Sequence, residues 1–125
     1  MATRSVIGMR TEDGRIRAVY CHWDGYLEGV GAILHTFYKD ANKITALLNR
    51  GGFSSLEPAI DDIEFYASKE GNLGNEAVTF STASDMIENW YGCEYFYVFE
   101  NGQWTVSTGD VFDSLYNQLK ETENG

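Results

Sequence analysis

Short stretches in which hydrophobic and polar residues alternate predict β-strands at six places along the chain. Four of these stretches predict two hairpins, because Asp13-Gly14 and Asn101-Gly102 lie between their members and favour tight turns that need a positive φ. The clearest stretch is the aromatic run at residues 95–99. The predicted strands cover residues 5–10, 15–22, 62–67, 76–80, 94–100 and 103–107.

Apolar residues at helical spacing predict two consecutive helices in the first half of the chain. The first covers residues 28–38. The second covers about residues 41–50, where Asp40 is placed to cap its start and Gly51-Gly52 to end it. The apolar stripe of the first helix consists of Val30, Ile33, Leu34 and Phe37.

Two further helices are predicted in the second half. Thr82 or Ser84 would cap a short helix that extends to Tyr91, and Asp110 would cap the last helix of the chain. The apolar positions are Met86, Ile87 and Trp90 in the short helix, and Val111, Phe112, Leu115 and Leu119 in the last one.

The order of these elements predicts an α+β fold. Hairpins are mixed with helices without regular strand–helix alternation, which favours an antiparallel sheet of about six short strands with about four helices packed mainly on one face. A length of 125 residues fits one domain, residues 1–125. The polar end, residues 121–125, is predicted to fray.

Composition favours a folded chain in a reducing compartment. Hydrophobic residues make up 43% of the chain, which is enough to build a core. Cys21 and Cys93 are too few for a disulfide framework, so we expect free thiols and a cytoplasmic location. No apolar segment follows Met1 as in a signal peptide, and none approaches the roughly 18 residues of a membrane span.

Charge is distributed unevenly. The net charge is −10; residues 1–50 hold seven Lys/Arg and five Asp/Glu, whereas residues 51–125 hold two and fourteen. This balance disfavours direct binding to nucleic acid or to an anionic membrane, and it favours a partner protein with a basic surface. The acidic residues predicted to face such a partner are Asp61, Asp62, Glu64, Glu70, Glu76, Asp85, Glu88 and Asp113.

The most distinctive segment is Cys21-His22-Trp23-Asp24-Gly25-Tyr26, followed by Gly29-Val30-Gly31. In an extended segment, His22 and Asp24 would project to one side, and Cys21 and Trp23 to the other. One hypothesis makes this loop a nucleotide site, in which aromatic rings stack on a base while basic side chains and glycine amides hold phosphate. The residues of that site would be Arg4, His22, Trp23, Asp24, Tyr26, Gly29 and Gly31.

Other chemistry finds little support in the sequence. There is no Cys-x-x-Cys or His-x-x-x-His pair for a metal, and the Gly29-Val30-Gly31 spacing is neither a P-loop nor a dinucleotide fingerprint. The sequence therefore predicts no metal, no cofactor and no catalytic set. Asp61-Asp62-x-Glu64 is interpreted as a solvated strand edge rather than as a Mg²⁺ site.

The sequence resembles a family of small, mostly uncharacterised proteins of bacteriophages, prophages and related elements. The residues that carry the resemblance are Thr3-Arg4-Ser5, the run from Tyr20 to Tyr26, Gly51-Gly52-Phe53 and the aromatic C-terminal hairpin. Leu27 stands where the family usually has proline, which should loosen the entry to the first helix. The resemblance implies a phage or mobile-element origin and brings no established activity.

These observations lead to three hypotheses. The first is a phage accessory protein that binds a basic host factor and acts as a DNA-mimic-like inhibitor of a defence system such as CRISPR-Cas. The second is a nucleotide-binding protein or small hydrolase that uses the segment 21–31. The third makes the loop a structural corner, with Asp24 capping backbone amides and Trp23 in the core. A homodimer is compatible with each of them.

Overall fold

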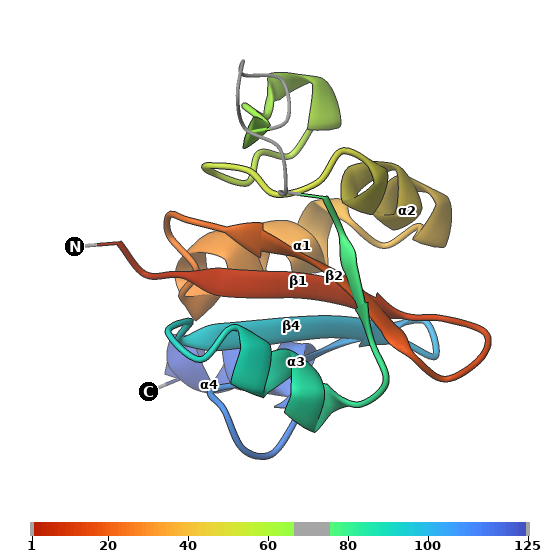
Figure 1. Cartoon of the computed structure of the whole chain (residues 1–125). Coiled ribbons are helices and arrows are strands. Elements are labelled where there is room, and N and C mark those ends of the chain that lie inside the picture. The colour runs from red at the N-terminus through yellow and green to blue at the C-terminus, as the bar shows by residue number, and fades with distance from the viewer. Residues whose placement is uncertain (1, 67–75, 125) are drawn as a thin grey trace.

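The computed structural model describes residues 2–66 and 76–124, in which a six-stranded sheet carries helices on both faces (Figure 1). The fold is α+β, as predicted. The strands are β1 (Ser5–Arg10), β2 (Ile16–Cys21), β3 (Val78–Phe80), β4 (Tyr95–Glu100), β5 (Gln103–Ser107) and β6 (Asp113–Ser114). The helices are α1 (Ala32–Phe37), α2 (Ala41–Asn49), α3 (Ala83–Asn89) and α4 (Leu115–Asn124), with a π-helical turn η1 (Leu27–Gly31) and a 3-10 turn η2 (Ile60–Asp62).

The strand order is β3-β2-β1-β4-β5-β6. All neighbouring pairs are antiparallel except β1 and β4, which run parallel, with Ser5 opposite Tyr95. The amides of Glu94 and Tyr95 donate to the carbonyl of Arg4 at 2.9 and 3.4 Å and align the starts of the two strands. The sheet is therefore mostly antiparallel, as predicted, and the sequence did not reveal the one parallel pair at its centre.

The rear face of the sheet, which carries Ile7 and Val19, holds the larger core. Helices α1, α2 and α4 lie against it, and each contributes fully buried side chains. Leu34 of α1, Leu47 of α2 and Leu115 of α4 are all 0% exposed. Three of the four helices thus lie on one face, as predicted.

The opposite face, which we call the front face, carries Val6, Ala18 and Phe96. Among the described residues, α3 is the one helix that packs against it, through Met86. A seven-residue helix covers only part of a six-stranded sheet, so some of the front face stays open.

Several turns and caps form where the sequence predicts them. Asp40 Oδ1 accepts from the amide of Asn42 at 3.0 Å, and Thr82 Oγ1 accepts from the amide of Asp85 at 3.1 Å. Gly51 ends α2 with a φ of 84°, a left-handed conformation that suits glycine. These local signals act over a few residues and do not depend on the tertiary fold.

The first predicted helix differs in form from the expectation. The chain enters it through the π-helical turn η1, and α1 begins only at Ala32. Val30 and Leu34 are buried as predicted, whereas Phe37 is 47% exposed at the end of α1. Tyr38, four residues after Leu34, is fully buried at the end of this helix instead.

The predicted strand over residues 62–67 is wrong within the described part of that range. Ile63 and Phe65 are buried, which explains their alternation, but Phe65 forms only an isolated bridge with Phe53. The segment runs beside residues 52–54, where the amide of Tyr66 donates to Gly52 at 3.1 Å. Burial against the rear core, rather than membership of the sheet, sets the pattern.

The last helix begins at Leu115 and not after Asp110. Asp110 lies in a turn, where its amide donates to Ser107 Oγ at 3.0 Å. Val111 is 67% exposed, and Phe112 packs against the front core instead of the helix stripe. The helix continues through Asn124, across most of the segment predicted to fray.

None of the helices within residues 2–66 and 76–124 has the length and apolar character that crossing a bilayer requires.

One buried hydrogen bond ties the distinctive loop to the sheet. Tyr97 of β4 is 0% exposed, and its hydroxyl donates to the carbonyl of Gly25 at 2.7 Å. We expect Tyr97→Phe to lower the free energy of unfolding by about 1–3 kcal/mol, because it leaves that carbonyl without its partner. Urea denaturation measures the loss. Tyr91→Phe, at a side chain that is 89% exposed, should change stability by less than about 0.5 kcal/mol.

Candidate functional site

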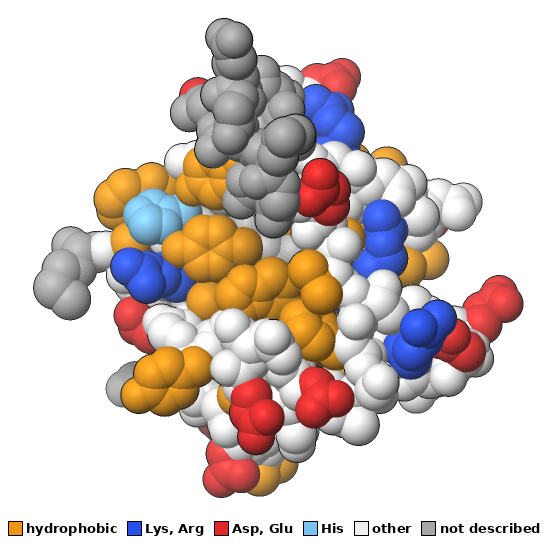
Figure 2. Space-filling view, in the orientation of Figure 1, with side chains coloured by type: hydrophobic (Ala, Val, Ile, Leu, Met, Phe, Trp, Pro, Cys, Tyr) orange, Lys and Arg blue, Asp and Glu red, His pale blue; other side chains and the backbone are white. Residues whose placement is uncertain are grey.

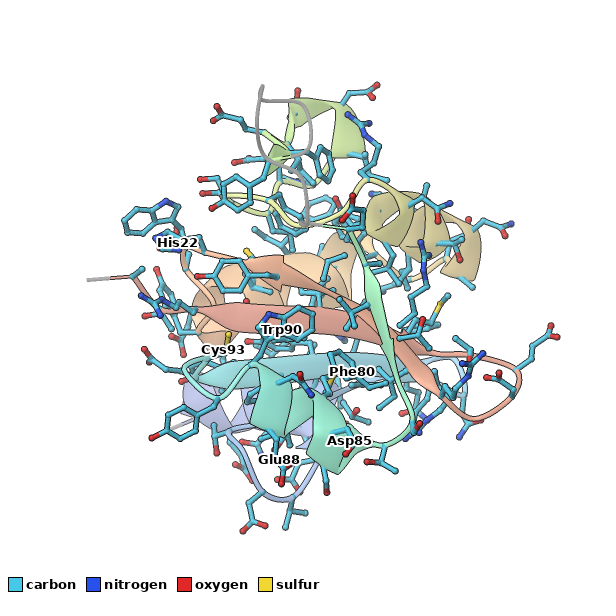
Figure 3. The ribbon with its side chains drawn as sticks, in the orientation of Figure 1. His22, Phe80, Asp85, Glu88, Trp90 and Cys93 are labelled. Carbon is cyan, nitrogen blue, oxygen red and sulfur yellow. The ribbon has the colours of Figure 1, made fainter. Side chains whose placement is uncertain are left out.

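The front face has a hollow of about 610 Å³ between α3 and the edge of the sheet formed by β2 and β3. Figure 2 shows hydrophobic side chains gathered at the centre of this face, and Figure 3 places Asp85 and Glu88 below them on α3. We call this feature the front-face hollow. Its lining residues are Arg4, Tyr20, Glu76, Val78, Phe80, Asn89, Trp90, Tyr91, Gly92 and Cys93.

Two aromatic rings meet in the wall of the hollow. Phe80 ends β3, and Trp90 follows the last turn of α3, where its amide donates to Met86 at 3.1 Å. The ring centroids lie 5.3 Å apart at an interplanar angle of 69°, the edge-to-face arrangement that aromatic pairs favour. Both side chains lie on the viewer's side of the sheet in Figure 3. The half-buried Trp90 therefore keeps ring surface available to a ligand.

Hydrogen-bond donors gather at one end of the hollow. The pairing of Val6 with Tyr20 brings Arg4 and His22 to the same end of β1 and β2. Tyr20 Oη and His22 Nδ1 lie 2.7 Å apart and share one hydrogen. Whichever group donates it, the pair keeps another O–H or N–H, on Tyr20 in the lining or on His22 next to it. Burial raises the pKa of Tyr20, so its hydroxyl stays protonated at neutral pH.

The Arg4 side chain is exposed and contributes a positive charge to this end. It lies close enough to Tyr20 and Cys93 to oppose the rise in pKa of both groups. The two ion pairs found within the described parts of the chain join Arg10 to Glu100 and Arg15 to Asp13. Neither of them involves the Arg4 side chain. Its guanidinium can therefore bind an anionic group from solution.

The two thiols are poorly suited to nucleophilic catalysis. Burial raises the pKa of Cys21 to about 12 and that of Cys93 to about 11. Both are therefore protonated at neutral pH, whereas a nucleophilic cysteine acts as a thiolate. Within residues 2–66 and 76–124, no group of three His, Cys, Asp or Glu side chains is arranged to hold a metal.

The loop from Cys21 to Tyr26 is a packed corner between β2 and η1. The amide of Trp23 donates to Ser54 at 2.9 Å, and the amide of Gly25 donates to Thr3 at 2.8 Å. Asp24 takes a φ of 57°, and its backbone carbonyl accepts from the amide of Val30 at 2.8 Å. The corner is held by the backbone of Asp24, whereas the sequence predicted a cap from its side chain.

Trp23 does not enter the core, contrary to the structural hypothesis. It is 43% exposed and meets His22 edge-on, with ring centroids 4.6 Å apart. Because β2 ends at Cys21, the alternation of an extended strand no longer applies to the residues that follow. Tyr26 is 38% exposed and donates its hydroxyl to Asp24 Oδ1 at 3.4 Å.

The glycine amides that the nucleotide hypothesis assigned to phosphate already have acceptors. Those of Gly29 and Gly31 donate to the carbonyl of Tyr26 at 3.1 and 3.4 Å. A Cβ on Gly29 would lie 2.3 Å from the carbonyl oxygen of Asp24. A Cβ on Gly31 would lie 3.2 Å from Tyr97 Oη. Close packing therefore explains both glycines, and of the predicted ligand residues only Arg4 lines the hollow.

The predicted acidic surface is divided among several parts of the molecule. Asp61 and Asp62 lie on η2, in the yellow-green segment at the top of Figure 1, whereas α3 lies at the lower front. Among the described residues of this acidic set, Glu76 alone lines the front-face hollow, and Asp85 and Glu88 lie beside it on α3. The full positions are Asp61 and Asp62 in η2, Glu64 beyond it, Glu76 before β3, Asp85 and Glu88 in α3 and Asp113 in β6, and Glu70 lies outside the described residues.

Sequence reasoning missed most of the hollow. It assigned Trp90 to the apolar side of a helix and predicted the strand that includes Phe80, but it did not bring the two together. One signal was present in the sequence. The predicted strand that contains residues 76, 78 and 80 is followed by a single short helix, which indicates that this helix packs on the sheet near that strand.

Comparison of the chain with protein-family models, curated proteins and solved structures gives no match. The resemblance to phage proteins therefore stays a prediction.

The packing of the Cys21–Tyr26 corner predicts that Gly29 and Gly92 differ in how much stability is lost when each is replaced by alanine. We expect Gly29→Ala to lower the free energy of unfolding by about 2 kcal/mol or more, because its Cβ would clash with backbone. Gly92→Ala is the control, because its Cβ would meet only the flexible end of Arg4 at 3.5 Å. Equal midpoints for both variants in urea denaturation would contradict the assignment of a packed corner.

Proposed function

We propose that the protein is a binding protein that holds a small anionic ligand in the front-face hollow without covalent chemistry. The observation that carries the proposal is Arg4, an exposed cation at the end of an aromatic hollow of about 610 Å³. Ligand sites are usually concave, mostly apolar and about 300–1,000 Å³ in volume, with a few polar groups that orient the ligand. The hollow has this volume and polar groups that could orient a ligand, and its lining is polar and apolar in similar measure.

Binding rather than catalysis is supported by the chemistry of the lining. Cys93, the one nucleophilic thiol in the hollow, is held protonated by burial. His22 is already engaged with Tyr20. The groups that remain are donors, acceptors and ring surfaces, which orient a molecule but do not by themselves break a bond.

The proposal is tested by thermal-shift measurements with a panel of small carboxylates, phosphates and sulfates. A ligand at 100 times its Kd should stabilise the protein by about 2.7 kcal/mol, because it binds only the folded state. Arg4→Gln should abolish this shift. The matched control is Arg15→Gln, which removes the same charge at the tip of the first hairpin. The proposal would be overturned if no compound of the panel stabilised the protein, or if Arg4→Gln and Arg15→Gln lost the thermal shift equally.

A second candidate is a phage protein that inhibits a host defence complex by binding its basic, DNA-contacting surface, as in a CRISPR-Cas effector. The observation that favours it is the position of Asp85 and Glu88, both exposed on α3 beside the aromatic hollow. Protein interfaces commonly combine an aromatic centre with a charged rim. The net charge of −10 would steer the protein toward a basic partner.

Neutralisation of α3 tests this second candidate. Asp85→Asn/Glu88→Gln should weaken inhibition of DNA binding by a purified CRISPR-Cas effector about five- to tenfold at low salt, because two rim charges are lost. Asp61→Asn/Asp62→Asn removes two charges from η2 and should have little effect. The candidate fails if the parent chain leaves DNA binding unchanged, or if both double variants lose inhibition equally.

A further inference from the structure

The walls of the front-face hollow suit a planar ring. Tyr20, Phe80 and Trp90 contribute aromatic surface from β2, β3 and the end of α3. Aromatic side chains stack on nucleobases of every type, because each base presents a π-face. This aromatic surface shares the lining with the exposed guanidinium of Arg4. The combination suits a ligand that carries both a planar ring and an anionic group.

Two side chains in the same lining can accept hydrogen bonds from such a ring. Asn89 Nδ2 donates to the carbonyl of Asp85 at 2.8 Å, which fixes the orientation of the amide and leaves Oδ1 as an acceptor. The Glu76 carboxylate, when ionised, also only accepts. These groups favour a base edge that donates, and they disfavour an edge with a carbonyl in the same place.

The donors lie with Arg4. The guanidinium can bind a phosphate through two parallel N–H···O bonds. The Tyr20–His22 pair keeps at least one further donor at this end of the sheet. The hollow thus combines donors for an anion, ring surface and acceptors for an amino group.

We propose that the ligand of the front-face hollow is a nucleoside phosphate whose base carries an exocyclic amino group, held by Arg4 at the phosphate, Trp90 at the ring and Asn89 at the amino group. This inference rests on the proposed function and names the chemical class of its ligand. It also moves the nucleotide site from the Cys21–Tyr26 corner to the front face.

The experiment is a fluorescence titration of the full chain carrying Trp23→Phe. Of the three tryptophans, Trp104 is 5% exposed and donates its indole N–H to Tyr38, so it should not respond. Trp90 then reports on the hollow. The probes are AMP, adenosine, IMP, UMP and ribose 5-phosphate.

AMP should quench the fluorescence and bind at least about tenfold more tightly than adenosine, which lacks the anion. IMP and UMP should bind about tenfold more weakly than AMP, because a carbonyl replaces the amino group opposite Asn89. Arg4→Gln should remove the advantage of AMP over adenosine while leaving adenosine unchanged. Asn89→Ala should remove the preference for AMP over IMP.

Equal binding of AMP and adenosine would overturn the inference, as would equal binding of AMP and UMP, or an Arg4→Gln variant that weakens adenosine as much as AMP. If nucleotides fail while another anion still stabilises the protein through Arg4, only the inference fails. If no anion binds through Arg4, the proposed function fails with it. Circular dichroism of each variant confirms that the fold is retained.

Discussion

The parallel pairing of β1 with β4 joins the two halves of the chain into one sheet. β1 lies between β2 and β4, and its side chains enter both cores, with Val6 in front and Ile7 behind. The same pairing aligns Arg4 with the start of β4 and brings the segment that contains Cys93 beside it. The position of the basic end of the hollow is therefore a consequence of strand register, and loop sequence alone does not determine it.

The two faces of the sheet are covered unequally, and this inequality creates the candidate site. Three helices and the segment around Phe53 and Phe65 fill the rear face, whereas the front face has the short α3. Where α3 ends, Trp90 stays half-buried against the buried ring of Phe80, and polar side chains border the pair. The Cys21–Tyr26 corner, by contrast, is held by hydrogen bonds to the backbone of Thr3, Ser54 and Val30 and to the hydroxyl of Tyr97.

Features determined by a few neighbouring residues could be predicted from the sequence, and features determined by distant contacts could not. The hairpin at Asn101-Gly102, the cap by Asp40 and the α+β class follow from local turn and cap chemistry. The parallel central pair, the non-strand at residues 63–66 and the late start of α4 depend on tertiary packing. For the site, Arg4 was predicted but its surroundings were not, because they come from three other segments of the chain.

The pairing of β1 with β4 also limits the order in which parts of the chain can fold during synthesis. Ser5 pairs with Tyr95, which is synthesised much later. On the ribosome the N-terminal hairpin can therefore form early, but β1 pairs with β4 only after most of the chain has emerged. Until then one edge of β1 is unpaired and the rear core lacks the side chains of β4, β5 and α4. Products of incomplete translation therefore expose a strand edge, which makes them substrates for chaperones and proteases.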